Sequence, residues 1–224
     1  QVVVSATKGL ELGTGKRMSQ ILREELPSSM HSRICALSGP NLAAEIIQEK
    51  PTSTVIASGN TDASRQAQAT ITSPRFRVYT NDDIVGVELA GALKNIVALG
   101  AGICDGLQYG DNAKAAFMTR GLAEIARLGV AAGANPLTFA GLAGMGDLIT
   151  TCSSTLSRNH YVGEKLAEGR PLEEIWASMK NVAEGIDTTS AAIVLAEKLG
   201  VEMPITQATY NVLFNKVALD QAIS

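Results

Sequence analysis

The stretch DDIVGVELAGALKNIVALGAGIC, residues 82–104, decides the fold of this chain. Its apolar residues recur at helical spacing and no turn dipeptide interrupts them, so the stretch predicts one long helix. Alanine and glycine are abundant along the whole chain, while aromatic residues make up only 4% of it. This composition suits closely packed helices rather than a disordered chain.

Before residue 82, β-branched runs alternate with helical stretches. We expect strands at 1–6, 34–37, 52–57 and 76–80, with helices between them at 12–26, 41–48 and 62–71. Strands and helices in this order predict a parallel α/β sheet.

After residue 82 we expect helices alone. Beyond the long helix, they are predicted at 113–128, 158–167, 172–179, 188–199 and 205–214. Asp187 or Thr188 is a reasonable N-cap for the helix at 188–199. On the amphipathic helix 113–128, Arg120, Glu124 and Arg127 are expected to lie away from the buried face. The chain therefore divides into an α/β part at 1–81 and an all-α part at 82–224.

The uncharged stretch 128–146 is long enough to raise the question of a membrane span. It contains five glycines together with Asn135 and Pro136. These residues break a continuous apolar helix, so we expect a helix end, a turn and a glycine-rich loop, and no membrane span.

Charge and cysteine usage exclude several classes of protein. The chain has 19 basic and 22 acidic residues, a net charge of −3, and so lacks the basic surplus typical of nucleic-acid or membrane-surface binders. Cys35, Cys104 and Cys152 are odd in number and far apart, which argues against a disulfide framework and favours the reducing cytoplasm. We interpret His31 and His160 as surface or capping residues, so no metal site is expected.

Lys94 is the most unusual residue of the long helix. Its helical neighbours are small and apolar, so it has no carboxylate partner on its own helix. Composition alone favours a side chain that runs along the helix surface with its ammonium in water. If the ammonium instead enters a cleft, desolvation lowers its pKa and allows proton exchange near neutral pH.

Three further segments carry groups suited to a phosphorylated ligand. Ser157-Arg158-Asn159 opens a predicted helix, where free N–H groups and a guanidinium can hold a phosphate; an ordinary helix cap is the alternative. Glycines at 141–146 allow close backbone approach, and Asp147 can accept hydrogen bonds from hydroxyls; a flexible loop is the alternative. Lys8 directly follows a strand, as does the turn at 38–41, and the ends of strands face the ligand crevice in open α/β sheets.

Several common motifs are absent from the sequence. No complete GxGxxG occurs, and Gly15-Lys16 is followed by Arg17 rather than by the Ser or Thr of a Walker motif. There is no GxSxG elbow and no HExxH. Nucleotide hydrolysis, serine hydrolysis and zinc chemistry therefore lose support.

Read together, the segments resemble the bacterial type of NAD(P)-dependent glycerol-3-phosphate dehydrogenase. The resemblance rests on ATKGLE at 6–11, LSGP at 37–40, VELAGALKN at 87–95, GLAGMGDL at 141–148, TLSRN at 155–159 and NVAEG at 181–185. It implies a partial Rossmann-type parallel sheet domain at 1–81, the C-terminal part of a dinucleotide-binding domain. A helical substrate-binding and catalytic domain is implied at 82–224.

The resemblance also implies an activity and a set of site residues. The enzyme interconverts sn-glycerol 3-phosphate and dihydroxyacetone phosphate with NAD or NADP, and supplies glycerophospholipid synthesis in the cytoplasm. Lys94 is similar to the catalytic lysine that takes the proton of the secondary hydroxyl. The implied substrate-binding residues are Lys8, Gly39, Asn41, Lys94, Asp147, Ser157, Arg158 and Asn159. The implied cofactor contacts are Lys8, Ala43, Arg158, Val182 and Glu184. A homodimer is compatible with the resemblance, and neither nucleic acid nor a metal is implied.

Two departures from the family pattern stand out. Asn41 lies where the family usually has serine or threonine. The glycine-rich loop and the first strands of the family are expected upstream of Gln1, and the chain also ends early, so we expect these residues alone to oxidise glycerol 3-phosphate negligibly.

Two alternatives remain open at the level of sequence. A dehydrogenase of the 6-phosphogluconate or 3-hydroxyisobutyrate type also combines a dinucleotide domain with helices and a catalytic lysine. A non-catalytic helical interaction module derived from such an enzyme is the second, although pure scaffolding needs neither Lys94 nor the cluster at 157–159.

Overall fold

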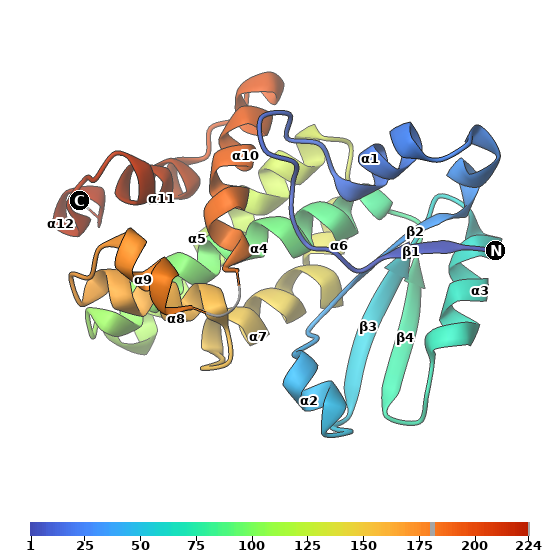
Figure 1. The fold of residues 1–224 in the computed structure, drawn as a ribbon, viewed down its shortest axis with the longest axis horizontal. Helices are drawn as coiled ribbons and strands as arrows, with labels where there is room; N and C mark the ends of the chain where they lie inside the picture. The colour runs from blue at the N-terminus through green and yellow to red at the C-terminus, as the bar shows by residue number, and fades with distance from the viewer. Residues whose placement is uncertain (180–181, 224) are drawn as a thin grey trace.

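A four-stranded sheet forms one side of the molecule, and helices form the other (Figure 1). The structure is a computed structural model that describes residues 1–179 and 182–223. The strands follow one another across the sheet in chain order, as β1 (Val3–Ser5), β2 (Ile34–Ser38), β3 (Thr52–Ala57) and β4 (Phe76–Asn81). The four predicted strands are confirmed within a few residues.

The sheet is mixed rather than wholly parallel. β1 pairs with β2, and β3 with β4, in parallel, but β2 and β3 are antiparallel. The reason lies in the connection between them, which holds only the short helix α2 (Ala43–Ile47), none of whose residues is buried. A parallel crossover needs a helix that packs on the sheet, and α2 does not do so. The chain therefore turns back beside β2.

The two faces of the sheet are covered by different elements. Alternate residues of a strand point to opposite faces. Cys35 and Ile56 pack under α3 (Thr61–Ile71), whereas Ala36 and Val55 pack against the helical half. The sheet thus presents one apolar face to its own helix and the other to the rest of the molecule.

The longest helix, α4 (Ile84–Gly106), packs against most of the helical half and against β2 and β3, and the other elements complete the two halves. In the sheet half these are α1 (Met18–Glu25) and the 3₁₀ turn η1 (Ser28–Arg33). In the helical half they are α5 (Gly110–Ala131), α6 (Pro136–Phe139), the π-helical turn η2 (Leu142–Gly146), α7 (Asp147–Ser153), α8 (Arg158–Ala167), α9 (Leu172–Ser178), α10 (Glu184–Leu199), α11 (Pro204–Phe214) and α12 (Leu219–Ile223).

α4 is buried along most of its length, with 18 of its 23 residues inaccessible. By length and composition it is the one described helix that could cross a membrane, since an 18-residue stretch of it has a mean hydropathy of 1.6. However, 83% of that stretch is buried inside the protein. Its hydrophobicity is therefore explained by its place in the core. The stretch at 128–146 forms parts of α5, α6 and η2 instead.

Small residues allow α8 to lie very close to α4. A Cβ atom on Gly102 would come within 2.0 Å of the carbonyl oxygen of His160, and one on Gly163 within 2.0 Å of that of Leu99. Gly102 of α4 and Gly163 of α8 are thus required by close packing against backbone. They set the distance between two helices that form part of the cavity wall.

Five sequence expectations are wrong in detail. The helix expected from residue 12 begins at Met18, because Gly13 and Gly15 adopt positive φ and form a turn. The helix expected from 188 begins at Glu184; a cap at Asp187 or Thr188 is not needed, because Asn159 accepts the hydrogen bond of the Gly185 N–H at 2.9 Å. The predicted loop at 141–146 is the π-helical turn η2, which packs tightly under Phe139.

The fourth error concerns Glu124, which is buried rather than on the polar face of α5. Its carboxylate accepts hydrogen bonds from the N–H groups of Ile205 and Thr206, each at 2.8 Å. Glu124, on α5, therefore caps the amino end of α11. The sequence of α5 alone does not indicate this role. His160 is likewise buried instead of lying at the surface, and its Nε2 lies 2.6 Å from Asp105 Oδ2.

The close approach of α4 and α8 gives a stability prediction. Gly102→Ala should lower the free energy of unfolding by about 2–3 kcal/mol, since its methyl group must displace the backbone of α8. Urea unfolding followed by circular dichroism measures the change. Gly59→Ala, where a Cβ meets nothing within 4 Å, is the control and should change stability by less than about 0.5 kcal/mol. Equal stability of the two variants would contradict the packing argument.

Candidate active site

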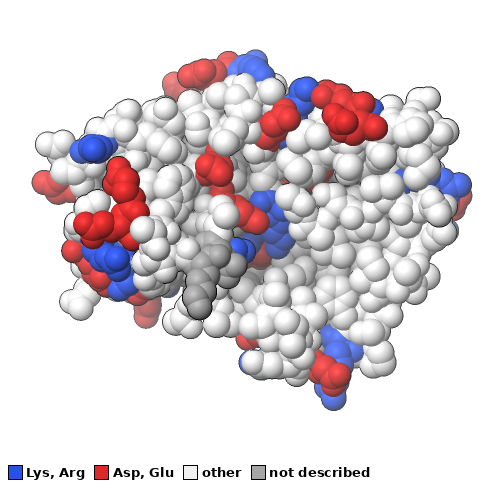
Figure 2. All heavy atoms as spheres, viewed as in Figure 1, with Lys and Arg blue, Asp and Glu red and all other residues white. Residues whose placement is uncertain are grey.

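A cavity of about 770 Å³ opens between the sheet half and the helical half. Its walls come from the ends of β1 and β2, from α2, and from α4, α7, α8 and α10. On the face of the molecule seen in Figure 2, Lys and Arg side chains gather at the centre, between the sheet half and the helical half. The cations that line the cavity are Lys8, Lys94 and Arg158.

Asp147 joins two of these cations at the bottom of the cavity. Its Oδ2 lies 2.6 Å from Lys8 Nζ, and its Oδ1 lies 2.9 Å from Lys94 Nζ. The carboxylate is only 2% exposed. Two ammonium groups and one carboxylate leave an excess of one positive charge in a buried place, which favours an anionic ligand.

Lys94 enters this cleft instead of extending along the helix surface into water. It is 6% exposed, and its Nζ donates a hydrogen bond to Thr151 Oγ1 at 2.5 Å. Asp147 and Thr151 lie four residues apart on α7, so both face α4 from the same side. The expectation from composition is therefore wrong, because the missing polar partners come from a neighbouring helix.

Burial lowers the pKa of Lys94 below that of a lysine in water. The charge of Lys8 lowers this pKa further, while Asp147 raises it without cancelling the effect of burial. Lys94 consequently gives up its proton more readily than an exposed lysine does. Burial raises the pKa of the neighbouring Cys152 to about 12, so this thiol stays protonated at neutral pH.

The amino end of α8 forms another wall of the cavity. Ser157 caps this helix by accepting the hydrogen bond of the His160 N–H. The Arg158 side chain is exposed and has no ion pair within the described part of the chain. A helix amino end beside an unpaired guanidinium is suited to a phosphate group.

Most of the predicted site residues line this one cavity: Lys8, Asn41, Ala43, Lys94, Asp147, Ser157, Arg158, Asn159 and Glu184. Gly39 lies just behind them, and its carbonyl oxygen accepts a hydrogen bond from Lys8 Nζ at 3.0 Å. Val182 is 60% exposed and is not among the lining residues. Asn181, part of the segment that resembles the family, lies outside the described residues.

Sequence reasoning missed two residues that the cavity contains. Thr151 binds Lys94, and its position four residues after Asp147 could have indicated it. Asn95 follows Lys94 directly, and its Nδ2 donates to Glu184 Oε2 at 3.3 Å. Asn95 thereby links α4 to the beginning of α10 at the cavity wall.

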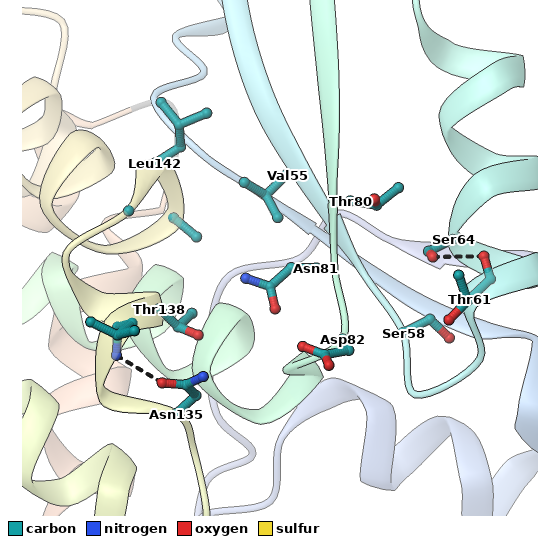
Figure 3. Close-up of a pocket in the computed structure, with 13 residues that line it drawn as sticks. Val55, Ser58, Thr61, Ser64, Thr80, Asn81, Asp82, Asn135, Thr138 and Leu142 are labelled. Atoms are coloured by element: carbon teal, nitrogen blue, oxygen red, sulfur yellow. Dashed lines mark hydrogen bonds between the residues drawn. The ribbon is translucent and has the colours of Figure 1, made fainter.

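A second cavity, of about 560 Å³, lies at the carboxyl ends of β3 and β4, away from the first cavity (Figure 3). Ser58, Thr61, Thr80, Asn81 and Asp82 line it from the sheet half, and Asn135 and Thr138 from the helical half (Figure 3). No lysine or arginine is among its lining residues, so it is unsuited to a phosphate ester. Among residues 1–179 and 182–223, no group of three or more potential ligands could hold a metal ion.

The fold and the cavity together define a class, that of two-part Rossmann-type proteins with a buried lysine between sheet and helices. Residues 1–64 match the family model of the NAD-dependent glycerol-3-phosphate dehydrogenase N-terminus, and residues 83–224 match that of its C-terminus. The chain belongs to the NAD-dependent glycerol-3-phosphate dehydrogenase family.

Individual relatives agree with this assignment. The chain is 57% identical over 214 residues to glycerol-3-phosphate dehydrogenase [NAD(P)+] of Dehalococcoides mccartyi, a match that covers 96% of the chain and 60% of that protein. It is 52% identical to the enzyme of the same name from Chlorobium limicola, covering 100% of the chain and 67% of the relative. The chain therefore spans less than two thirds of the Dehalococcoides protein.

A solved structure shows the same fold. The glycerol-3-phosphate dehydrogenase of Coxiella burnetii superposes with a TM-score of 0.92 at 37% identity, covering 100% of this chain and 67% of that one. The enzyme of Saccharomyces cerevisiae superposes with a TM-score of 0.85 at 31% identity, covering 99% and 66%. The predicted fold class, a Rossmann-type sheet followed by helices, is confirmed.

The lowered pKa of Lys94 gives a prediction about stability and pH. The folded chain holds this proton less tightly than the unfolded chain, so the charged lysine costs stability below its ordinary pKa of 10.5. Lys94→Met should therefore be more stable than the wild type near pH 7, since Asp147 keeps Lys8 as its partner. Its advantage should shrink as the pH rises toward 10.5, which urea unfolding at several pH values measures. A Lys94→Met variant that is less stable by the same amount at every pH would refute this.

Proposed function

We propose that the full-length protein interconverts sn-glycerol 3-phosphate and dihydroxyacetone phosphate with NAD or NADP. The observation that carries the proposal is the buried cluster of Lys8, Asp147 and Lys94 beside the unpaired Arg158. The names of the relatives with more than 50% identity support the same activity. They do not favour a 6-phosphogluconate or 3-hydroxyisobutyrate dehydrogenase.

In the direction of oxidation, Lys94 acts as the general base. Its neutral amine takes the proton of the secondary hydroxyl while the C2–H bond breaks. When bound, NAD(P)⁺ accepts the hydride that leaves C2. In the direction of reduction the Lys94 ammonium returns the proton to the oxyanion formed from the ketone. The lowered pKa of Lys94 supports both roles, because a base works best with a pKa near the working pH.

The phosphate end of the substrate is held by the amino end of α8. Arg158 supplies a guanidinium, and Ser157 and the helix N–H groups supply further donors. Lys8 and Asp147 orient the rest of the substrate next to Lys94, and the shared carboxylate keeps both ammonium groups in place. Binding at one end and proton transfer at the other fix the reacting carbon between them.

The cavity also suits the reactive end of the dinucleotide. Ala6, Ala43 and Ala44 make part of its wall small and apolar, which leaves room for a planar ring. Asn95 and Glu184 add an amide and a carboxylate within hydrogen-bond distance of each other. We assign Lys8, Ala43, Arg158, Val182 and Glu184 as cofactor contacts.

Cofactor binding and substrate binding are assigned to different parts of the chain. We assign residues 1–81 to the cofactor domain and residues 82–224 to the substrate domain, supported by the end of β4 at Asn81 and by the family match from residue 83. The three cysteines are buried and unpaired, which supports a reducing cytoplasm as the place of action. We further propose a homodimer as the working assembly.

Lys94→Met tests the general base in the full-length protein. Proton transfer by a positioned base is worth about 10²–10⁴ in rate, so kcat for glycerol 3-phosphate oxidation should fall by about 10³. Calorimetric binding of glycerol 3-phosphate should stay within about threefold of the wild type, because Arg158 and Ser157 remain. NAD(P)H absorbance gives the rate.

Two matched variants sharpen this test. Lys198→Met removes an exposed lysine at the far end of α10 and should leave kcat unchanged. Arg158→Met should raise KM for glycerol 3-phosphate at least about tenfold with a smaller effect on kcat, because a charge-assisted phosphate contact is lost. Near-normal turnover by Lys94→Met would exclude Lys94 as the base.

A further inference from the structure

The turn that joins β2 to α2, residues 38–41, makes contacts that the proposed reaction does not use. Asn41 lines the cavity, but both ends of its side-chain amide are already engaged by β3. Its Oδ1 accepts a hydrogen bond from Thr54 Oγ1 at 2.7 Å, and its Nδ2 donates to the carbonyl oxygen of Ser53 at 3.2 Å. These bonds use the oxygen and one of the two N–H groups of the amide, and they fix the plane of the Asn41 side chain against β3.

Thr54 connects both ends of the same turn. It is fully buried, and its Oγ1 lies 3.0 Å from the carbonyl oxygen of Ser38 as well as 2.7 Å from Asn41 Oδ1. One hydroxyl therefore lies within hydrogen-bond distance of two acceptors, one before and one after Gly39. The turn lies directly on β3, because a Cβ atom on Gly39 would come within 3.0 Å of Thr54 Cα.

The position of this turn matters for Lys8. Lys8 Nζ has two partners, the carbonyl oxygen of Gly39 at 3.0 Å and Asp147 Oδ2 at 2.6 Å. Asp147 belongs to the helical half, so Gly39 is the partner through which the sheet half holds the ammonium. If the turn moves away from β3, the carbonyl of Gly39 moves with it, and Lys8 keeps only its bond to Asp147.

We propose that Thr54 and Asn41 form a bracket that positions Lys8 through the carbonyl of Gly39. On this view Asn41 is a positioning residue, and Thr54 is a second one that no motif indicates. The inference rests on the proposed function, in which Lys8 contacts the substrate. It gives Asn41 a positioning role beside the predicted contact with glycerol 3-phosphate.

The hydroxyl of Thr54 can be removed with little change of shape. Thr54→Val in the full-length protein takes away the hydroxyl that lies within hydrogen-bond distance of both ends of the turn. We expect KM for glycerol 3-phosphate to rise about tenfold, with kcat within about threefold of the wild type, because Lys94 keeps Asp147 and Thr151. A merely structural threonine would lower the melting temperature without moving KM.

Two variants serve as controls for this experiment. Thr52→Val changes the same residue type on the same strand, where the hydroxyl binds only the carbonyl oxygen of Lys50, and should leave KM unchanged. Thr54→Ser keeps a hydroxyl at this position, so its KM should lie within about twofold of the wild-type value. If Thr54→Val matches Thr52→Val, or if Thr54→Ser is as impaired as Thr54→Val, the bracket is overturned.

The pairing of the two residues is tested by a double-mutant cycle. Asn41→Ala removes the same hydrogen bond from its other end, so combining it with Thr54→Val should add less than about twofold to KM. Fully additive effects would show that the two residues act separately, and would overturn the proposal.

Hydrogen exchange separates failure of this inference from failure of the proposed function. Amide exchange in a peptide covering residues 38–44 should be faster in Thr54→Val than in Thr52→Val, whatever the protein catalyses. A wild type without activity on glycerol 3-phosphate and dihydroxyacetone phosphate would refute the function. Unchanged exchange in Thr54→Val would refute the bracket, even in an active enzyme.

Discussion

The shared carboxylate of Asp147 is the interaction on which the rest of the site depends. Two ammonium groups that lie in one cleft repel each other, and the ion-pair partner of each among the described residues is Asp147, from another segment. Asp147 holds both, and it comes from another element, α7, so the attraction offsets the cost of burying these charges only where the three segments meet in good geometry. The tight packing around α4 supplies that geometry.

The same requirement explains the composition of the helical half. α4 must bring Lys94 to α7 while α8 places Arg158 on the other side of the cavity. Glycine at 102 and 163 lets the backbones of α4 and α8 nearly touch, which leaves little freedom in their relative position. The abundance of small residues is thus a consequence of where the charged groups must lie.

Much of the fold could be predicted because its signals are local. The strands at 52–57 and 34–37 are set by β-branched and apolar runs, and the helix at 158–167 by its cap and terminal glycine. The errors occur where a residue far away in the sequence determines the burial of a side chain or the first residue of a helix. Glu124 is buried because α11 offers it unpaired N–H groups, and α10 begins early because Asn159 satisfies Gly185. The direction of β3 depended on whether α2 packs on the sheet, which its short sequence does not reveal.

The reversal of β3 has a practical consequence. It separates the sheet into an end that meets the cavity, where β3 and β4 begin, and a far end, where β3 turns into α3. Gly59, in that far turn, has open space around it. A fluorescent or spin label attached there would report on movements between the two halves while leaving the charged cleft untouched.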